Sequence, residues 1–351
     1  MFYRDIHVFR ALAILFIVAG HSRLMLNWAE DSFANNLLAD FLANGTTLFV
    51  FIAGYLFQAL SARYAHKRYL RSKLRNVILP YLLISIPAVI YSALYKDPVL
   101  RFPQLAETSD AFRILWFYIK GGAHLNYPLW FIPMITLYYL CAPVFMQFVR
   151  RPRLYWLIAP FFLISLFLHR DAFPNLDTLQ NFVYFLAAYL AGMCAAQYRD
   201  TVSAFIARNL HWLAASYLII LVLQALFAQR HGVHGTVEWF GTENGAFDWS
   251  FLQKMVLCFL LLGISDRLQG LLYSPTKFIA DSSFGVFFVH AYFLEIAPRI
   301  LRPVFPGGEA PGVGTIFGLV AVIGFAAGCS MLFCYLTKRV FGDRSRPLIG
   351  Y

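Results

Sequence analysis

The chain has 351 residues, of which 60% are apolar and only 13% are charged, and its net charge is +11. Soluble domains carry about 25% charged residues, so this composition excludes an ordinary soluble protein and predicts one all-α integral membrane domain over residues 1–351, with no separate soluble domain. The positive charge does not indicate a nucleic-acid partner, because the Lys and Arg residues lie in short clusters between apolar blocks.

Ten apolar segments are long enough to cross about 30 Å of hydrocarbon as helices. In chain order they are 9–28, 37–61, 77–95, 127–149, 154–169, 179–197, 210–228, 249–265, 283–300 and 314–337. We therefore predict a polytopic membrane protein of about ten transmembrane helices. The five cysteines show no metal-ligand spacing, so no metal is expected.

The first segment contains FRALAILFIVAGHS, which carries Arg10 and His21 with ten uncharged residues between them. Eleven positions make about three helical turns, so both side chains project from one helix face, about 16 Å apart along the axis. An ionisable residue at membrane depth is costly and is by default a functional candidate. A simpler explanation is an arginine that snorkels to the interface and a histidine that hydrogen-bonds to a neighbouring helix.

The basic residues predict the orientation of the segments. Residues 63–75 include six Lys and Arg residues, 150–153 include three, and 338–346 include four. Because cytoplasmic loops are enriched in Lys and Arg, we predict that these three stretches and both termini are cytoplasmic. The longer stretches 96–126 and 229–248 then lie outside, where their composition suits a polar ligand.

Five motifs occur in an order that resembles one known family. They are DIHVFRALAILFIVAGHS (5–22), LFVFIAGYLF (48–57), RYLRSKLRNVILPYLL (68–83), PLWFIPMITLYYLCAPV (128–144) and FGVFFVHAYFL (284–294). The set resembles the acyltransferase-three family of bacterial integral-membrane acyltransferases, which acylate exopolysaccharides, O-antigens and other envelope glycans. That family begins with an arginine, ten residues and a histidine, as Arg10 and His21 do here. The resemblance implies a multi-pass protein of the bacterial cytoplasmic (inner) membrane.

The resemblance also implies the reaction: an acyl group, most often acetyl, moves from acetyl-CoA to a hydroxyl of a glycan or a lipid-linked sugar. Histidine is the natural base for this step, because its ordinary pKa lies near neutral pH. We therefore expect His21 to deprotonate the acceptor hydroxyl. In the alternative, His21 first carries the acyl group itself.

Cations near the cytoplasmic end of the first segment are candidates for binding the donor. CoA is polyanionic, and guanidinium groups suit its phosphates. The candidates are Arg10, Arg68, Arg71, Lys73 and Arg75. If they hold the nucleotide there, the pantetheine arm extends along the first helix toward His21. The alternative is that the cluster at 63–75 is only a topology signal.

Four residues are candidates for contacting the acceptor. Trp130 and Phe131 lie near the outer end of the fourth segment, where aromatic rings stack on a sugar, line an acyl tunnel or form an interfacial belt. His290 and Glu295 lie within the ninth segment, where either of them could orient His21 or bind the acceptor; the alternative for His290 is a hydrogen-bonded core residue. Weaker candidates, chosen only by position, are His124, Asn126, Glu238, Glu243 and Asp248.

A polytopic transporter or glycan flippase is the main alternative function, because polar residues inside membrane helices also mark translocation paths. Inverted repeats and paired broken helices would favour a transporter, and the sequence has no detectable internal repeat. A structural or sensory membrane protein is a third possibility. It gives no reason for an arginine and a histidine on one helix face at different depths.

The orientation is testable by cysteine-accessibility labelling in intact cells. We expect positions within 63–75 to be protected from a membrane-impermeant reagent and positions within 96–126 to be labelled, because the basic stretch is predicted to be cytoplasmic. Labelling of 63–75 from outside would reject the orientation, and with it a cytoplasmic site for the acyl donor.

Overall fold

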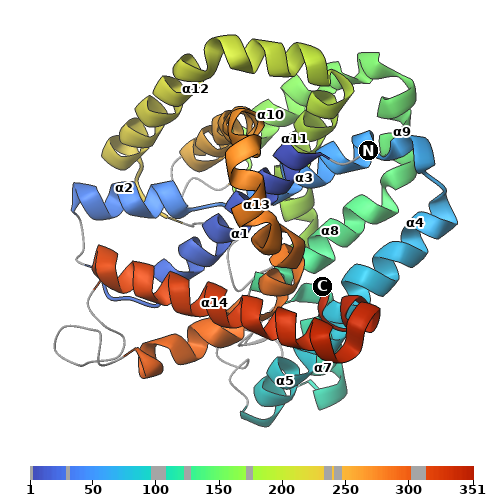
Figure 1. Cartoon of the computed structure of the whole chain (residues 1–351), viewed down its shortest axis with the longest axis vertical. Coiled ribbons are helices and arrows are strands. Elements are labelled where there is room, and N and C mark those ends of the chain that lie inside the picture. Colours follow the sequence, from blue (N-terminus) through green and yellow to red (C-terminus); the bar gives the residue numbers. More distant parts are fainter. Residues whose placement is uncertain are drawn as a thin grey trace.

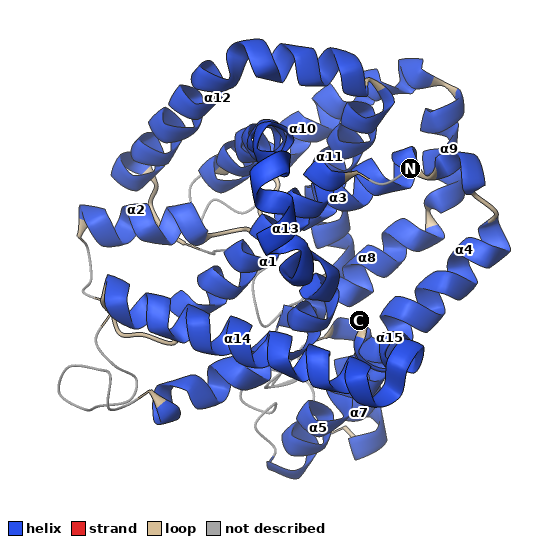
Figure 2. Cartoon of the chain, in the orientation of Figure 1, coloured by secondary structure: helices blue, strands red, loops and turns tan. Residues whose placement is uncertain are grey.

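The structure is a computed structural model that describes residues 3–28, 32–95, 108–121, 128–170, 177–232, 239–240, 247–301 and 314–351, with only the backbone of 93–95. Within these residues it consists of helices joined by loops and contains no strand (Figure 2). The all-α fold expected from the composition is therefore confirmed. The longer helices are α1 (Arg4–Arg23), α2 (Phe33–Leu42), α3 (Thr46–Ala59), α4 (His66–Lys73), α5 (Leu79–Tyr95), α7 (Asp110–Lys120), α8 (Phe131–Leu140), α9 (Ala142–Arg150), α10 (Ile158–Phe167), α11 (Thr178–Gln197), α12 (Arg199–Phe227), α13 (Trp249–Ile300) and α14 (Ile316–Phe341). The short ones are η1 (Ser61–Arg63), η2 (Leu74–Ile78), η5 (Pro152–Leu157), η8 (Gly342–Arg344) and α15 (Ser345–Ile349).

Several helices begin at a polar residue whose side chain caps the first turn. Ser32 caps α2, Ser109 caps α7 and Asp177 caps α11, each by accepting from a backbone N–H of the first turn. Asp248 and Thr315 do the same for α13 and α14. The first N–H groups of a helix have no partner within the helix. These polar residues therefore set the points at which the apolar segments become helical.

Seven helical segments are long and apolar enough to cross a membrane, or up to eight if the pair α8 and α9, which meet at 54°, is one span. The ten crossings predicted from the sequence are not confirmed. Part of the difference lies in α13, a continuous helix of 52 residues that contains both predicted segments 249–265 and 283–300. A straight helix of this length would extend about 78 Å, more than twice the roughly 30 Å of a bilayer core, so α13 must change direction between the two segments.

The two halves of α13 run in opposite directions between the ends of the bundle. Near its start, Lys254 donates to carbonyl oxygens at the C-terminal end of α2, and this end of α2 lies against the C-terminal part of α1. The middle of α13 reaches the beginning of α1, where the Tyr273 ring lies 5.8 Å from that of His7. The second half then follows α1 back, so that His290 meets His21.

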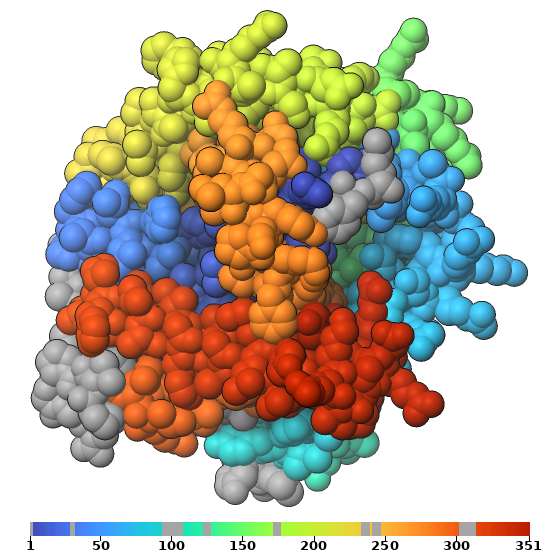
Figure 3. Space-filling view, in the orientation of Figure 1, coloured from blue at the N-terminus to red at the C-terminus, as the bar shows by residue number. Residues whose placement is uncertain are grey.

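Helix α1 occupies the centre of the bundle (Figure 1). It packs against α2, α3, α13 and α14, and on the face shown in Figure 3 the helices α13 and α14 lie over it. Val8, Phe9 and Ala11 have no exposed surface. Because α1 is enclosed by other helices, most of its polar side chains beyond Arg4 face protein, which is the usual setting of functional ionisable residues in membrane helices.

Helices α3 and α11 cross at two glycines. A Cβ atom on Gly54 would overlap the carbonyl oxygen of Tyr189, and a Cβ atom on Gly192 would overlap that of Phe51. Small residues of this kind let two membrane helices approach closely, so that van der Waals contact between their backbones holds them together. Both glycines are therefore required by the close approach.

Residues near both ends of the chain lie at one end of the bundle, which we call the basal end. The Arg4 guanidinium lies 5.3 Å from the centre of the Tyr273 ring. The Tyr351 ring lies 6.2 Å from that of Phe278, so both ends of the chain reach the same stretch of α13. In Figure 1 the N and C marks both lie in the right half of the view. The prediction that both termini face one side of the membrane requires this arrangement.

The α3–α11 crossing predicts the effect of adding one methyl group. We expect Gly54→Ala and Gly192→Ala each to lower the free energy of unfolding by about 1–3 kcal/mol, because the helices must separate. Gly324→Ala in α14 is the matched control, since nothing lies within 4 Å of a Cβ atom there. The thermal unfolding temperatures of the detergent-purified variants measure this loss of stability. Equal melting of Gly54→Ala and Gly324→Ala would contradict the crossing.

Candidate active site

Arg10 and His21 both contact α13. Nη2 of Arg10 donates to the carbonyl oxygen of Ala280 at 3.0 Å and to Oγ of Ser283 at 2.8 Å. Nδ1 of His21 lies 3.0 Å from Nε2 of His290. The contacts advance in the same direction along both helices, so α1 and the second half of α13 are parallel here. The two side chains that the sequence spacing places on one face of α1 therefore both contact α13.

The hydrogen bonds of His290 assign the protons on both rings. Nδ1 of His290 lies 3.1 Å from the carbonyl oxygen of Val286 and 2.8 Å from that of Phe287. Because carbonyl oxygens only accept, this nitrogen carries the hydrogen. Nε2 of a neutral His290 then bears the lone pair and accepts from Nδ1–H of His21. A neutral His21 therefore has its own lone pair on Nε2.

The two histidines differ in exposure. His290 has no exposed surface, whereas His21 is half-buried. Their rings are nearly parallel, with centroids 5.1 Å apart and planes at 25°. Of the pair, His21 is therefore the one that offers surface to a substrate, and His290 is enclosed behind it.

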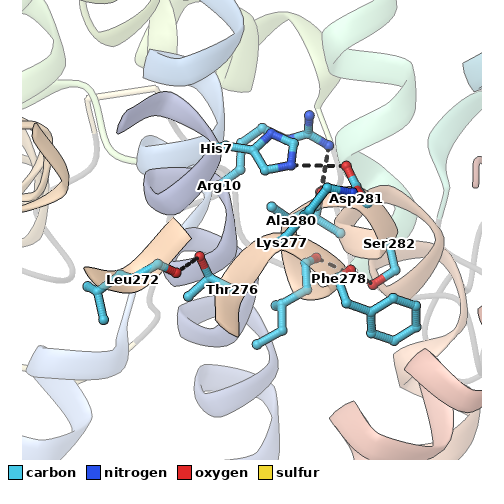
Figure 4. Close-up of polar contacts among 11 residues, drawn as sticks. His7, Arg10, Leu272, Thr276, Lys277, Phe278, Ala280, Asp281 and Ser282 are labelled. Carbon is cyan, nitrogen blue, oxygen red and sulfur yellow. Dashed lines mark hydrogen bonds and ion pairs between the residues drawn. The ribbon is translucent and has the colours of Figure 1, made fainter. Parts of the chain in front are cut away.

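Ionisable groups surround Arg10 at the basal end. Nε2 of His7 lies 3.0 Å from Oδ1 of Asp281, and Nζ of Lys277 donates to Oδ2 at 3.0 Å. Figure 4 shows the His7 ring and the Arg10 guanidinium both directed at the turn of α13 that contains Ala280 and Asp281. The Asp281 carboxylate is thus shared by His7 and Lys277, while neutral oxygens accept from Arg10.

The cations predicted to bind the donor occupy two environments. Lys73, at the end of α4, is half-buried, with its Nζ 5.2 Å from the centre of the Tyr69 ring and 4.7 Å from that of Tyr139. These rings hold the ammonium group in place. The exposed members are Arg68, Arg71 and Arg75. Among the cations of this stretch, Lys73 is therefore the one that the protein positions.

The two predicted aromatic residues are buried inside the bundle. Trp130 stacks on Phe185, with centroids 6.1 Å apart and planes at 21°. The Phe131 ring meets that of Phe287 edge-on at 5.4 Å, and the Phe287 ring lies 6.2 Å from that of His290. Their burial differs from that of an interfacial belt, which faces lipid headgroups. Phe287 instead packs beside His290, and Phe131 packs on Phe287.

Arg170, a residue that no sequence motif indicated, lies beside these rings. Its Cζ is 4.3 Å from the centre of the Trp130 ring, and its positive charge is close enough to act on His21. A fixed cation at this place can stabilise negative charge that develops on a carbonyl oxygen near the base. In the sequence, Arg170 is a lone cation at the end of an apolar segment, and such cations are common at membrane boundaries.

Two other predicted acceptor residues, Glu295 and Asp248, do not contact the histidine pair within the described residues. Glu295 lies five positions beyond His290 on α13, and within the described residues it forms no hydrogen bond or ion pair with either histidine. Asp248 caps α13 and accepts from the Tyr184 hydroxyl at 2.8 Å. It is therefore part of the helix start. The candidates that lie outside the described residues are His124, Asn126, Glu238 and Glu243.

A family model described as an acyltransferase domain, that of the acyltransferase-three proteins, matches residues 3–337. The matched range contains Arg10, His21 and His290, and the resemblance seen in five motifs is thereby confirmed over nearly the whole chain. No curated protein and no solved structure matches the chain.

The bond between the two histidines predicts coupled effects on stability. His21→Ala removes the donor to a buried nitrogen of His290, and His290→Ala removes the acceptor of His21, so each change should cost about 1–3 kcal/mol. The double variant should lose less stability than the sum of the two single losses, because no imidazole nitrogen is then left without its hydrogen-bond partner. Thermal unfolding of the four proteins in detergent measures this coupling, and simple additivity would contradict the bond.

Proposed function

The chain belongs to the acyltransferase-three family, whose domain spans residues 3–337, and from this we propose that it moves an acetyl group from acetyl-CoA to a sugar hydroxyl. The acceptor that we propose is an envelope glycan, an exopolysaccharide or a lipid-linked sugar, at the bacterial inner membrane. The family match supports acyl transfer itself and does not favour the alternative of a transporter or flippase.

The hydrogen bond between His21 and His290 carries this proposal, because it leaves the lone pair of His21 on Nε2. The acceptor oxygen attacks the thioester carbonyl carbon, and its proton passes to Nε2 of His21. His290 accepts from Nδ1–H of the imidazolium that forms and keeps the ring in place. The C–S bond then breaks, and the CoA thiolate takes the proton from Nε2.

The exposure of the two rings supports this division of roles. A base must reach the proton that it removes, and His21 has exposed surface whereas His290 has none. His290 is therefore a positioning residue in this proposal. Arg170 would stabilise the oxyanion of the tetrahedral intermediate, because its charge lies near His21.

A covalent route uses the same lone pair. Nε2 of His21 attacks the thioester carbonyl carbon, the CoA thiolate leaves, and an acyl-imidazole forms. The sugar hydroxyl then attacks the acyl carbon and displaces the imidazole. We prefer the direct route because it has fewer steps.

The donor would bind with its nucleotide at the basal end of the bundle and its thioester near His21. Arg10 and His21 are about 16 Å apart along α1, a distance that an extended pantetheine arm can cover. The cations predicted from the sequence to hold the phosphates there are Arg10, Arg68, Arg71, Lys73 and Arg75. The proposal requires the basal end to face the cytoplasm, where acetyl-CoA is made.

The acceptor would approach His21 from the opposite end of the bundle. Phe131 reaches the histidine pair through the Phe287 ring, and Trp130 lies against Arg170, whose charge acts on His21. Aromatic faces of this kind suit the apolar face of a sugar ring or the methyl of an acetyl group. Glu295, half-buried on α13, remains an acceptor candidate only through its position on the same helix.

Replacement of His21 tests the base directly. We expect His21→Ala to lower acyl transfer by about 10²–10⁴-fold while CoA binding is kept, because only general-base catalysis is lost. The assay measures transfer of labelled acetyl from acetyl-CoA to a panel of envelope glycans. His211→Ala is the matched control, since His211 is exposed on α12. Transfer at the native rate by folded His21→Ala protein would refute both routes.

The same assay without acceptor separates the two routes. An acyl group trapped on the native protein and missing from His21→Ala would favour the covalent route. Native protein that stays unlabelled under these conditions would favour general-base catalysis.

A further inference from the structure

The last helical turn, α15, folds back onto the basal end of the bundle, where it packs against α5 and η2. Oγ of Ser345 donates to the carbonyl oxygens of Gly342 and Tyr351. The Gly350 N–H donates to the carbonyl oxygen of Arg346 at 3.0 Å. The turn that carries Arg346 is therefore held by hydrogen bonds on both sides.

Gly350 allows this turn to dock on α13. Its φ is +79°, in the left-handed region that glycine adopts without strain, and a Cβ atom there would lie 2.9 Å from the Phe288 ring. Tyr351 adds its edge-on contact with Phe278. These contacts lie on the same stretch of α13 that accepts hydrogen bonds from Arg10. The docked turn therefore brings Arg346 to the surroundings of Arg10.

Three cations from separate parts of the chain meet at this place. The charge of Arg346 acts on both Arg10 and Lys73. Lys73 is held between two tyrosine rings, Arg10 is held by α13, and Arg346 is exposed on its docked turn. Two of the three cations are therefore fixed, and the third is exposed to solvent.

The acidic groups nearby do not neutralise this cluster. Within the described residues, neither Lys73 nor Arg346 forms an ion pair or a hydrogen bond to a carboxylate. Asp281 acts on Arg10, but its carboxylate already binds His7 and Lys277. Like charges held together repel each other, and a bound anion relieves that repulsion. This arrangement of charges favours the binding of an anion.

We propose that Arg10, Lys73 and Arg346 form one phosphate-binding site, and that its ligand is the 3′-phospho-ADP part of the acyl donor. This inference rests on the proposed function, which supplies a donor with several phosphates. Two guanidinium groups and one ammonium group suit such a ligand, because guanidinium grips phosphate oxygens in pairs and ammonium adds a compact charge.

The test measures CoA binding by calorimetry, with the full chain in nanodiscs of zwitterionic lipid. We expect Arg346→Ala to weaken CoA binding about 10- to 100-fold, as for loss of one charge-assisted contact, and to reduce its salt dependence. Arg346→Lys should retain part of the affinity, because the charge remains. Lys73→Ala should resemble Arg346→Ala. Pantetheine, which lacks phosphates, should bind all variants equally.

Arg344→Ala is the matched control. Arg344 is exposed and lies two positions from Arg346, in η8, so its loss changes the net charge equally without touching the cluster. We expect native CoA affinity for this variant. Equal weakening by Arg344→Ala and Arg346→Ala would show an effect of overall charge and would overturn the site.

Three further outcomes would overturn the inference. Native CoA affinity in folded Arg346→Ala protein that still transfers acetyl would remove Arg346 from the site and leave the proposed function standing. If the native protein binds no CoA, the proposed donor fails as well.

Nanodiscs with anionic phosphatidylglycerol test whether the phosphate comes from a lipid headgroup. Loss of lipid binding with unchanged CoA binding in Arg346→Ala would assign the cluster to lipid headgroups instead.

Discussion

A hydrogen bond between two imidazole rings, inside a bundle of apolar helices, is the interaction on which the arrangement of the site depends. Where water is excluded, a polar nitrogen without a partner is costly. His21 and His290 satisfy each other, and the second nitrogen of His290 is satisfied by carbonyl oxygens of its own helix. This requirement makes α13 the neighbour of α1, sets how both helices are rotated about their axes, and determines which nitrogen of His21 carries the lone pair.

What depends on one helix alone could be predicted from the sequence. The apolar lengths indicate helices, and helical periodicity places Arg10 and His21 on one face, where the structure shows them meeting the same neighbour. The partner of His21 could not be assigned in this way. His290 is 269 positions away, and the periodicity of one helix does not determine which face of another helix it meets. Its candidacy rested on the resemblance and on its position in an apolar segment.

The remaining differences between the sequence-based predictions and the structure have one physical origin. A charged stretch has the same composition whether it is solvated or folded into a site. Residues between 265 and 283 are polar enough to suggest a loop, yet they stay helical because groups such as Asp281 and Tyr273 find partners on α1. Arg346 belongs to a basic tail that predicts orientation, and only the docked turn at Gly350 brings it to Arg10 and Lys73.

Two parallel helices carry intervals of nearly equal length, from Arg10 to His21 on α1 and from Ala280 to His290 on α13. One residue added within either interval would rotate everything beyond it by about 100° and break one of the two contacts. Side chains along these stretches can be replaced during evolution as long as the new ones pack, but the number of residues in each stretch cannot change. Homologues that keep the same chemistry should therefore differ freely in loop length and share these two intervals without insertion or deletion.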